Sequence, residues 1–284
     1  MMLKKTIQIV VVLLLTIFSF YYTNKSIELI RMQDPIMKTI KNKESKYETK
    51  AINAIIKENT IIPGISGKVI DYDETYNKMK QYGAYNEVLT TLKEEKPAVS
   101  VEDYYDKYII SGNPAKKSVA LIFKVEKRSP KQTIEILDSK QIKATFFIDG
   151  YYLENNYNEI ATMTNHQLEL LSYNSTYDKI YFSASKDYLE TITKKPLKYC
   201  YCDYDNKEII NLCQSLNMHT VLPTIKVTSN PFQEVKSKLS NASIIVFSIT
   251  DQTNSELPTI LDYIKSRGYT LTTLTDLLNE NIDK

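Results

Sequence analysis

The stretch SVALIFKVE (residues 118–126) decides the fold, because it is a continuous apolar run of strand length that ends abruptly in charged residues. A second such run, KATFFIDG, follows at residues 143–150, and the helical pattern SPKQTIEILDSKQ lies between the two. Strand, helix and strand in this order are typical of a parallel βαβ unit. The charged ends of the two runs therefore mark the sheet edge where α/β proteins place their functional residues.

The same alternation continues to the end of the chain. Strands are predicted at residues 118–123, 144–148, 168–173, 199–203, 220–225, 243–249 and 270–274, with helical patterns between them. Seven strands in this order predict an α/β fold with a parallel sheet covered by helices. Alternation alone does not distinguish a closed barrel from an open sheet.

The first 24 residues predict a membrane segment. Lys4 and Lys5 precede the uncharged run TIQIVVVLLLTIFSFYYTN (residues 6–24), which is long enough to cross a bilayer. No small-x-small cleavage site follows, which favours a retained anchor over a cleaved signal peptide. The two lysines place the amino terminus in the cytoplasm and the rest of the chain outside, so the expected location is the cell membrane, with a single pass.

Composition separates the remaining chain into segments. We expect an anchor at 1–23, a Lys- and Glu-rich helical stalk at 24–59, a small α+β subdomain at 60–113 and the main domain at 114–284. The 36 basic and 34 acidic residues give a net charge of +2 without a basic stripe, which argues against a nucleic-acid partner. Three cysteines do not describe a disulfide framework, and YCYC lacks the spacing of a zinc site.

The order of the motifs in the main domain resembles a known family. The matching segments are SVALIFKVE, KATFFIDG, NHQLELLSYNS, KYCYCDYDNKEIINLCQSLNM, SIIVFSI and LPTILDYIKSRGYTLTTLTDLL. They resemble the NodB-type polysaccharide deacetylases, family 4 of the carbohydrate esterases, over residues 116–278. The resemblance implies a distorted (β/α) barrel of about seven parallel strands and metal-dependent hydrolysis of acetyl groups on glycans.

The resemblance also implies that the catalytic machinery has been lost. Lys124 stands at the position of the base, Lys198 at that of the arginine that holds the base, and Ser248 at that of the acid histidine. The metal-ligand positions fall on Val125, Leu171 and Ser175. The chain has only two histidines, His166 and His219, so no other alignment supplies both an H-x-x-x-H pair and an acid histidine. We therefore expect no cofactor.

Three functions remain open from the sequence. The first is an inactive relative of the deacetylases that binds a cell-wall glycan or an envelope protein, with Tyr151, Tyr173, Tyr199 and Tyr201 as candidate sugar contacts. The second is an active deacetylase with a rebuilt oxygen-ligand metal site made by Glu126, Asp149 and Asp203. The third is an envelope docking or scaffold protein, in which the segments before residue 114 carry the function.

Overall fold

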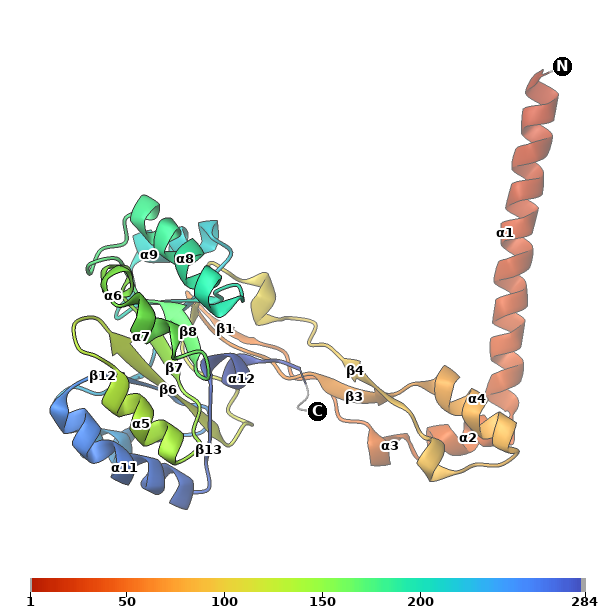
Figure 1. Cartoon of the computed structure of the whole chain (residues 1–284). Helices are drawn as coiled ribbons and strands as arrows, with labels where there is room; N and C mark the ends of the chain where they lie inside the picture. Colours follow the sequence, from red (N-terminus) through yellow and green to blue (C-terminus); the bar gives the residue numbers. More distant parts are fainter. Residues whose placement is uncertain (1, 282–284) are drawn as a thin grey trace. The chain divides into compact units, whose positions relative to one another are not determined.

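The computed structural model describes residues 2–281, with the side chains of the first helix described from Ile9 onward except Asn24. The side chains of Lys4 and Lys5, which set the predicted orientation, lie outside the described part. The chain forms two compact units (Figure 1). The N-terminal unit comprises residues 1–50 and 67–95, and the main unit comprises residues 51–66 and 96–284.

The N-terminal unit is mainly helical. Its elements are α1 (Met2–Gln33), α2 (Pro35–Asn42), α3 (Glu44–Tyr47), β3 (Gly67–Ile70), α4 (Tyr72–Tyr82), the 3₁₀ turn Glu87–Leu89 and β4 (Leu92–Glu95). Strands β3 and β4 pair antiparallel. Ile40, Ile70 and Met79 are buried together, and partly buried tyrosines surround them. This small core joins the α2–α4 helices to the two-stranded ribbon.

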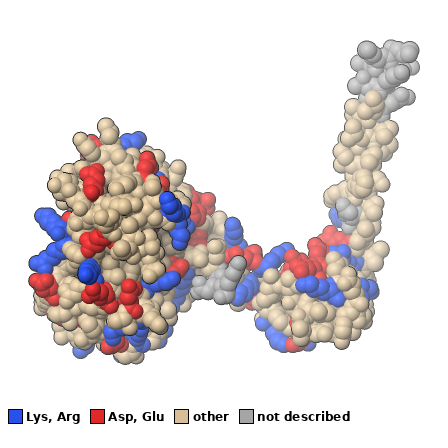
Figure 2. Space-filling view, in the orientation of Figure 1, with Lys and Arg blue, Asp and Glu red and all other residues tan. Residues whose placement is uncertain are grey.

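Helix α1 is the only helix among the described residues that is long and apolar enough to cross a membrane. Its candidate span runs over Ile9–Gln33, with a mean hydropathy of 1.4 and no part of it buried. Figure 2 shows this stretch almost free of charged side chains, whereas Lys, Arg, Asp and Glu are interspersed on the visible faces of both units. The sequence prediction of one N-terminal apolar helix is confirmed.

The main unit alternates strands and helices. Its elements before the long strands are β1 (Ile55–Lys57), β2 (Thr60–Ile62), the 3₁₀ turn Val101–Asp103 and β5 (Tyr108–Ile109). The alternating part comprises β6 (Ser118–Val125), α5 (Lys131–Ser139), β7 (Thr145–Ile148), α6 (Gly150–Asn155), α7 (Tyr157–Ala161), β8 (Gln167–Leu170), α8 (Lys179–Thr193), β9 (Tyr199–Tyr201), α9 (Lys207–Ser215), β10 (His219–Val221), β11 (Ile225–Lys226), α10 (Pro231–Lys238), β12 (Ile244–Ser248), α11 (Asp251–Ser266), β13 (Thr270–Thr272) and α12 (Leu274–Leu278). All seven predicted strands are present.

Hydrogen bonds divide these strands between two sheets. One sheet has the order β11-β12-β6-β7-β8, with β13 paired to the start of β6, and all its pairs are parallel. The other has the order β1-β2-β5-β10-β9 and is parallel except for the β1–β2 pair. The predicted α/β class with parallel strands is confirmed. The hydrogen-bonded strands, however, form two sheets and not one continuous barrel sheet.

A buried carboxylate lies where the two sheets face each other without a strand pair. Glu169 of β8 accepts hydrogen bonds at Oε2 from the backbone N–H groups of Lys198 and Tyr199, each at 3.0 Å. The side-chain amide of Gln167 donates to its Oε1 at 2.7 Å. Glu169 thus satisfies backbone donors at the edge of β9 that a neighbouring strand would otherwise satisfy.

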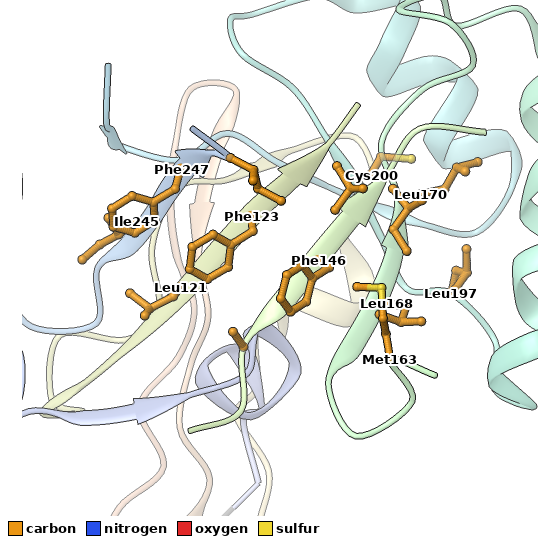
Figure 3. Packing of buried hydrophobic residues seen from close by; sticks show 14 of the residues in the cluster. Leu121, Phe123, Phe146, Met163, Leu168, Leu170, Leu197, Cys200, Ile245 and Phe247 are labelled. Carbon is orange, nitrogen blue, oxygen red and sulfur yellow. The ribbon is translucent and has the colours of Figure 1, made fainter. Parts of the chain in front are cut away.

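Each face of the longer sheet has its own core, because side chains alternate along a strand. On one face Phe123 stacks between Phe146 and Phe247, with both pairs of ring centroids 5.3 Å apart (Figure 3). Helices α5 and α11 cover this face (Figure 1). On the other face Ala120 and Ile122 belong to a second core that includes Tyr201 and Val221 of the other sheet. Lys124 is the next residue on that inner face.

Two predicted segment boundaries differ from the structure. Residues 24–59 were expected to form a helical stalk, but residues 51–59 include β1 and belong to the main unit. Residues 96–113 likewise belong to the main unit rather than to the expected subdomain at 60–113. The reason is burial, because Ile61 and Ile109 lie fully buried in the inner core. Strands of two or three residues are too short to show an alternation of apolar and polar residues, so the sequence does not predict which unit they join.

The cysteines also differ from expectation. Cys200 of β9 and Cys213 of α9 form a disulfide, while Cys202 is free and buried. The odd cysteine count obscured this pair, because spacing alone does not reveal that a strand and the following helix bring residues 200 and 213 together. The disulfide therefore fastens α9 to the sheet that carries β9.

Candidate functional site

Lys124 lies at the inner face of the carboxyl end of β6. In the parallel ladder its register partners are Ser248 on β12 and Phe147 on β7. Its Nζ lies 3.5 Å from Oδ2 of Asp203 and 5.5 Å from the centroid of the Tyr201 ring. The side chain is only 17% exposed. The lysine thus places a cation, paired with a carboxylate, at the mouth formed by the strand ends.

Two tyrosines extend the hydrogen bonding around Asp203. The Tyr201 hydroxyl donates to Oδ1 of Asp203 at 2.5 Å, and the Tyr177 hydroxyl donates to the backbone carbonyl of Tyr201 at 3.0 Å. Burial raises the pKa of both tyrosines, and the carboxylate of Asp203 raises both further. Both hydroxyls therefore stay protonated at neutral pH and act as hydrogen-bond donors rather than bases.

Asp149, which follows β7, is buried and hydrogen-bonded to the neighbouring backbone. The residue is 4% exposed and caps α6. Its Oδ1 accepts from the N–H groups of Tyr151, Tyr152 and Asn174, and its Oδ2 accepts from the Ser172 hydroxyl and the Ser175 N–H. These bonds tie the end of β7 to the loop after β8. Both oxygens already accept hydrogen bonds, so a metal ion would have to displace the donors of these bonds.

The positions of the family's metal ligands do not form a polar site. Val125 and Leu171 are buried apolar residues, at 0% and 3% exposure. Ser175 is exposed in a left-handed conformation with φ of 62°. Among residues 2–281, no three His, Cys, Asp or Glu side chains come together as a metal-binding group. The divalent metal that the fold family implies therefore does not fit these residues, and the expected rebuilt site of Glu126, Asp149 and Asp203 is not formed as one group.

Lys198 does not lie at this mouth. It precedes β9, and it lines two pockets at the opposite end of the strands, of about 520 and 610 Å³. The expectation that it replaces an arginine beside the base is wrong, because the start and the end of a strand lie at opposite edges of a sheet. Lys124 and Ser248, by contrast, are brought side by side.

Two of the four candidate sugar contacts are also wrong. Tyr199 and Tyr201 are 6% and 1% exposed, within the inner core. They lie two residues apart on β9, so both point to the same face, and that face is covered by the other sheet. Neither ring offers a surface on which a sugar can stack.

The other two candidates belong to an exposed tyrosine cluster, which we define as Tyr151, Tyr173 and Tyr181. The rings of Tyr173 and Tyr181 stack at 4.8 Å, and Tyr151 meets Tyr173 edge-on at 6.4 Å. Tyr151 and Tyr181 are 53% and 55% exposed. The sequence analysis did not name Tyr181. Its position in the first turn of α8, after the N-cap Asp178 and the exposed Ile180, could have indicated that it is exposed.

A pocket of about 520 Å³ adjoins this cluster. It is lined by Glu126, Lys127, Ser129, Asp149, Tyr151, Tyr152, Asn155, Asn156, Asn174 and Ser175. Its volume suits a small ligand, and its lining combines an aromatic face with amide, hydroxyl and charged groups. We call it the mouth pocket. It lies beside the carboxyl ends of β6 and β7, whose last residues lead to Glu126 and Asp149.

No protein-family model matches the chain. Among solved structures, the chain is similar to BA3943 from Bacillus anthracis, described as a CE4 family pseudoenzyme, with a TM-score of 0.69 and 23% identity over 88% of this chain and 97% of that chain. A BA3943 mutant with restored enzymatic activity matches equally well. The Bc1960 peptidoglycan N-acetylglucosamine deacetylase matches with a TM-score of 0.56 and 19% identity, over 64% of this chain and 97% of that one.

A sequence relative also matches most of the chain. The uncharacterized protein YlxY of Bacillus subtilis (strain 168) is 30% identical over 270 residues, covering 87% of this chain and 85% of YlxY. The solved structures establish the fold, and the sequence identity establishes the family. The protein has the fold of the family 4 carbohydrate esterases and belongs to the same family as YlxY.

Proposed function

We propose that the protein is a membrane-tethered pseudoenzyme that binds a cell-envelope glycan at the mouth of a deacetylase fold without hydrolysing it. The observation that carries the proposal is the Lys124–Asp203 pair, which occupies the mouth where the resemblance implies a base and a metal. Buried Val125 and Leu171 stand where carboxylate and histidine ligands would be. A buried aliphatic side chain cannot coordinate a metal or carry a proton.

The exposed tyrosine cluster supports the binding part of the proposal. Aromatic rings offer large rigid faces that lose little conformational freedom when a ligand covers them. The apolar C–H faces of a sugar ring suit such rings, and the hydroxyl groups suit the amides of Asn155, Asn156 and Asn174 in the adjoining pocket. A polysaccharide chain that lies over Tyr151 and Tyr181 would therefore place one of its sugar units in the mouth pocket.

The similar proteins fit this role. BA3943 is described as a pseudoenzyme and Bc1960 as a deacetylase of peptidoglycan. This chain combines the fold of both with an N-terminal apolar helix. We propose that this helix is a retained anchor with its amino terminus in the cytoplasm. The main unit would then meet the glycan outside the membrane.

Co-sedimentation with protein-free peptidoglycan tests the proposal. The full chain in detergent should sediment with the glycan, and Tyr151→Ala together with Tyr181→Ala should weaken sedimentation at least about tenfold. Tyr157 and Tyr188 provide a matched control, because they form another exposed stacked pair, with centroids 5.6 Å apart, outside the mouth pocket. Their replacement by alanine should leave sedimentation unchanged.

Two results would contradict the proposal. Equal sedimentation of both double variants would show that the tyrosine cluster does not bind the glycan. Sedimentation only in the presence of other envelope proteins would favour the docking role instead. Thermal unfolding of each variant shows whether a loss of binding reflects a loss of fold.

A further inference from the structure

The mouth pocket contains one carboxylate that is free to meet a ligand. Glu126 is exposed and, within residues 2–281, has no hydrogen bond or ion pair. Asp149 lines the same pocket, but its oxygens are occupied as described above. Glu159 does not line the pocket, and it accepts from the hydroxyls of Ser129 and Tyr152, which do. Glu126 is thus the carboxylate of this pocket that still lacks a donor.

Aromatic rings border the same space. Tyr151 lines the mouth pocket and meets Tyr173 edge-on, and the Tyr173 hydroxyl donates to Glu154 at 3.1 Å. The face of an aromatic ring is electronegative and attracts cations that lie within about 6 Å of the ring centre. Glu126 and Tyr151 thus line one pocket, and a carboxylate together with an aromatic face suits an ammonium group.

We propose that the mouth pocket selects a hexosamine with a free amino group over its N-acetylated form. This inference rests on the proposed glycan-binding function and names the kind of sugar bound. Removal of an acetyl group from an N-acetylated sugar leaves a primary amine, which carries three N–H donors when it is protonated. Glu126 accepts from this ammonium, and the Tyr151 ring covers it. The protein would thus recognise the product of a deacetylase rather than its substrate.

The acetylated sugar is disfavoured by the same contacts. An acetamide is neutral, so bringing it against Glu126 removes water from the carboxylate without supplying a charged donor. Lys127 also lines the pocket, and within residues 2–281 it has no hydrogen bond or ion pair. Its positive charge opposes an ammonium ligand. Removal of Lys127 should therefore strengthen the preference that removal of Glu126 abolishes.

Calorimetric titration of the full chain in detergent tests this inference with two probes, the tetramers of glucosamine and of N-acetylglucosamine. At pH 6 the glucosamine tetramer should bind at least about tenfold more tightly, as expected for one charge-assisted hydrogen bond. The preference should disappear above about pH 9, because even an α-amino group, which titrates near pH 8, is neutral there. The net charge of +2 gives the protein no general attraction for a cationic ligand.

Three variants make the test specific. Glu126→Gln should bring the two tetramers to within about twofold of each other, and Lys127→Gln should widen the preference about threefold. Glu135→Gln is the matched control, because Glu135 is an exposed carboxylate on α5 that lies outside the pocket. This control should keep the preference of the unchanged protein.

The outcomes distinguish this inference from the proposed function. Equal or tighter binding of the acetylated tetramer would overturn the amino-sugar inference and leave glycan binding standing. A preference that persists in Glu126→Gln would overturn the role of the pocket. Binding of neither tetramer would overturn both the inference and a glycan-binding function based on this sugar.

Discussion

The ammonium of Lys124 lies 3.5 Å from the carboxylate of Asp203, across the mouth where the resemblance implies a metal and a base. This pair and the Tyr201 hydroxyl, which also binds Asp203, form a closed polar network on top of an apolar core. Asp203 therefore contacts both the Lys124 ammonium and the Tyr201 hydroxyl.

Core packing and the mouth should respond differently to truncation. Phe146 is fully buried, stacks on the Phe123 ring and meets the His166 ring in a T-shaped contact. Phe146→Ala should lower the free energy of unfolding by about 3 to 5 kcal/mol, whereas Lys124→Ala should change it by less than about 1 kcal/mol. Chemical denaturation measures both. Equal losses would contradict the placement of these two residues.

Asp149 should behave as a structural residue. Asp149→Ala removes the cap of α6 and leaves the N–H groups of the loop after β8 without acceptors. We expect a loss of about 2 to 4 kcal/mol in unfolding free energy. Glu126→Ala, at the rim of the same pocket, should be neutral. If Asp149→Ala is as stable as the unchanged protein, the structural role is contradicted, and this carboxylate becomes a candidate for ligand binding.

Glu169 should make stability depend on pH. Burial raises the pKa of Glu169 from 4.5 to about 7. The folded state therefore holds a proton that the unfolded state releases, so the stabilisation is complete below about pH 4.5 and is lost as pH rises through about 7.

The variant Glu169→Gln isolates this effect. The unfolding free energy of the unchanged protein, relative to Glu169→Gln, should fall by about 2 to 4 kcal/mol between pH 5 and pH 8.5. Denaturant titrations at several pH values measure the difference. A flat or rising difference would mean that the carboxylate between the sheets is ionised throughout.

The disulfide predicts a thiol count and a stability change. The unreduced, unfolded chain should expose one reactive thiol, that of Cys202. Cys213→Ser, which opens a loop of 13 residues, should lower the unfolding free energy by about 2 to 3 kcal/mol. Three reactive thiols before reduction would show that Cys200 and Cys213 are not joined.

Much of the fold follows from the sequence, because long apolar runs such as residues 118–123 determine strands by themselves. The inner orientation of Lys124 also follows, since it continues the alternation of Ala120 and Ile122. The division into two sheets does not follow, because it depends on β5, a strand of two residues, and on the buried side chain of Glu169. Local patterns do not record such long-range partners.

The candidate site was only partly predictable. Strand ends located Lys124, Ser248 and Asp203, whose neighbourhood depends on the ladder register. The exposure of a tyrosine depends on what covers it, so Tyr201 is buried beneath the second sheet while Tyr181 is exposed on a helix. Sequence position after a strand does not separate these two cases.

The most direct test of binding without turnover is the release of acetate from N-acetylated chito-oligosaccharides by the full chain in detergent, with Zn²⁺ or Mn²⁺ supplied. We expect no acetate above the level of a protein-free sample, from a preparation that still sediments with peptidoglycan. Sustained acetate release that Asp203→Asn abolishes would contradict it and would show that the mouth is an active site.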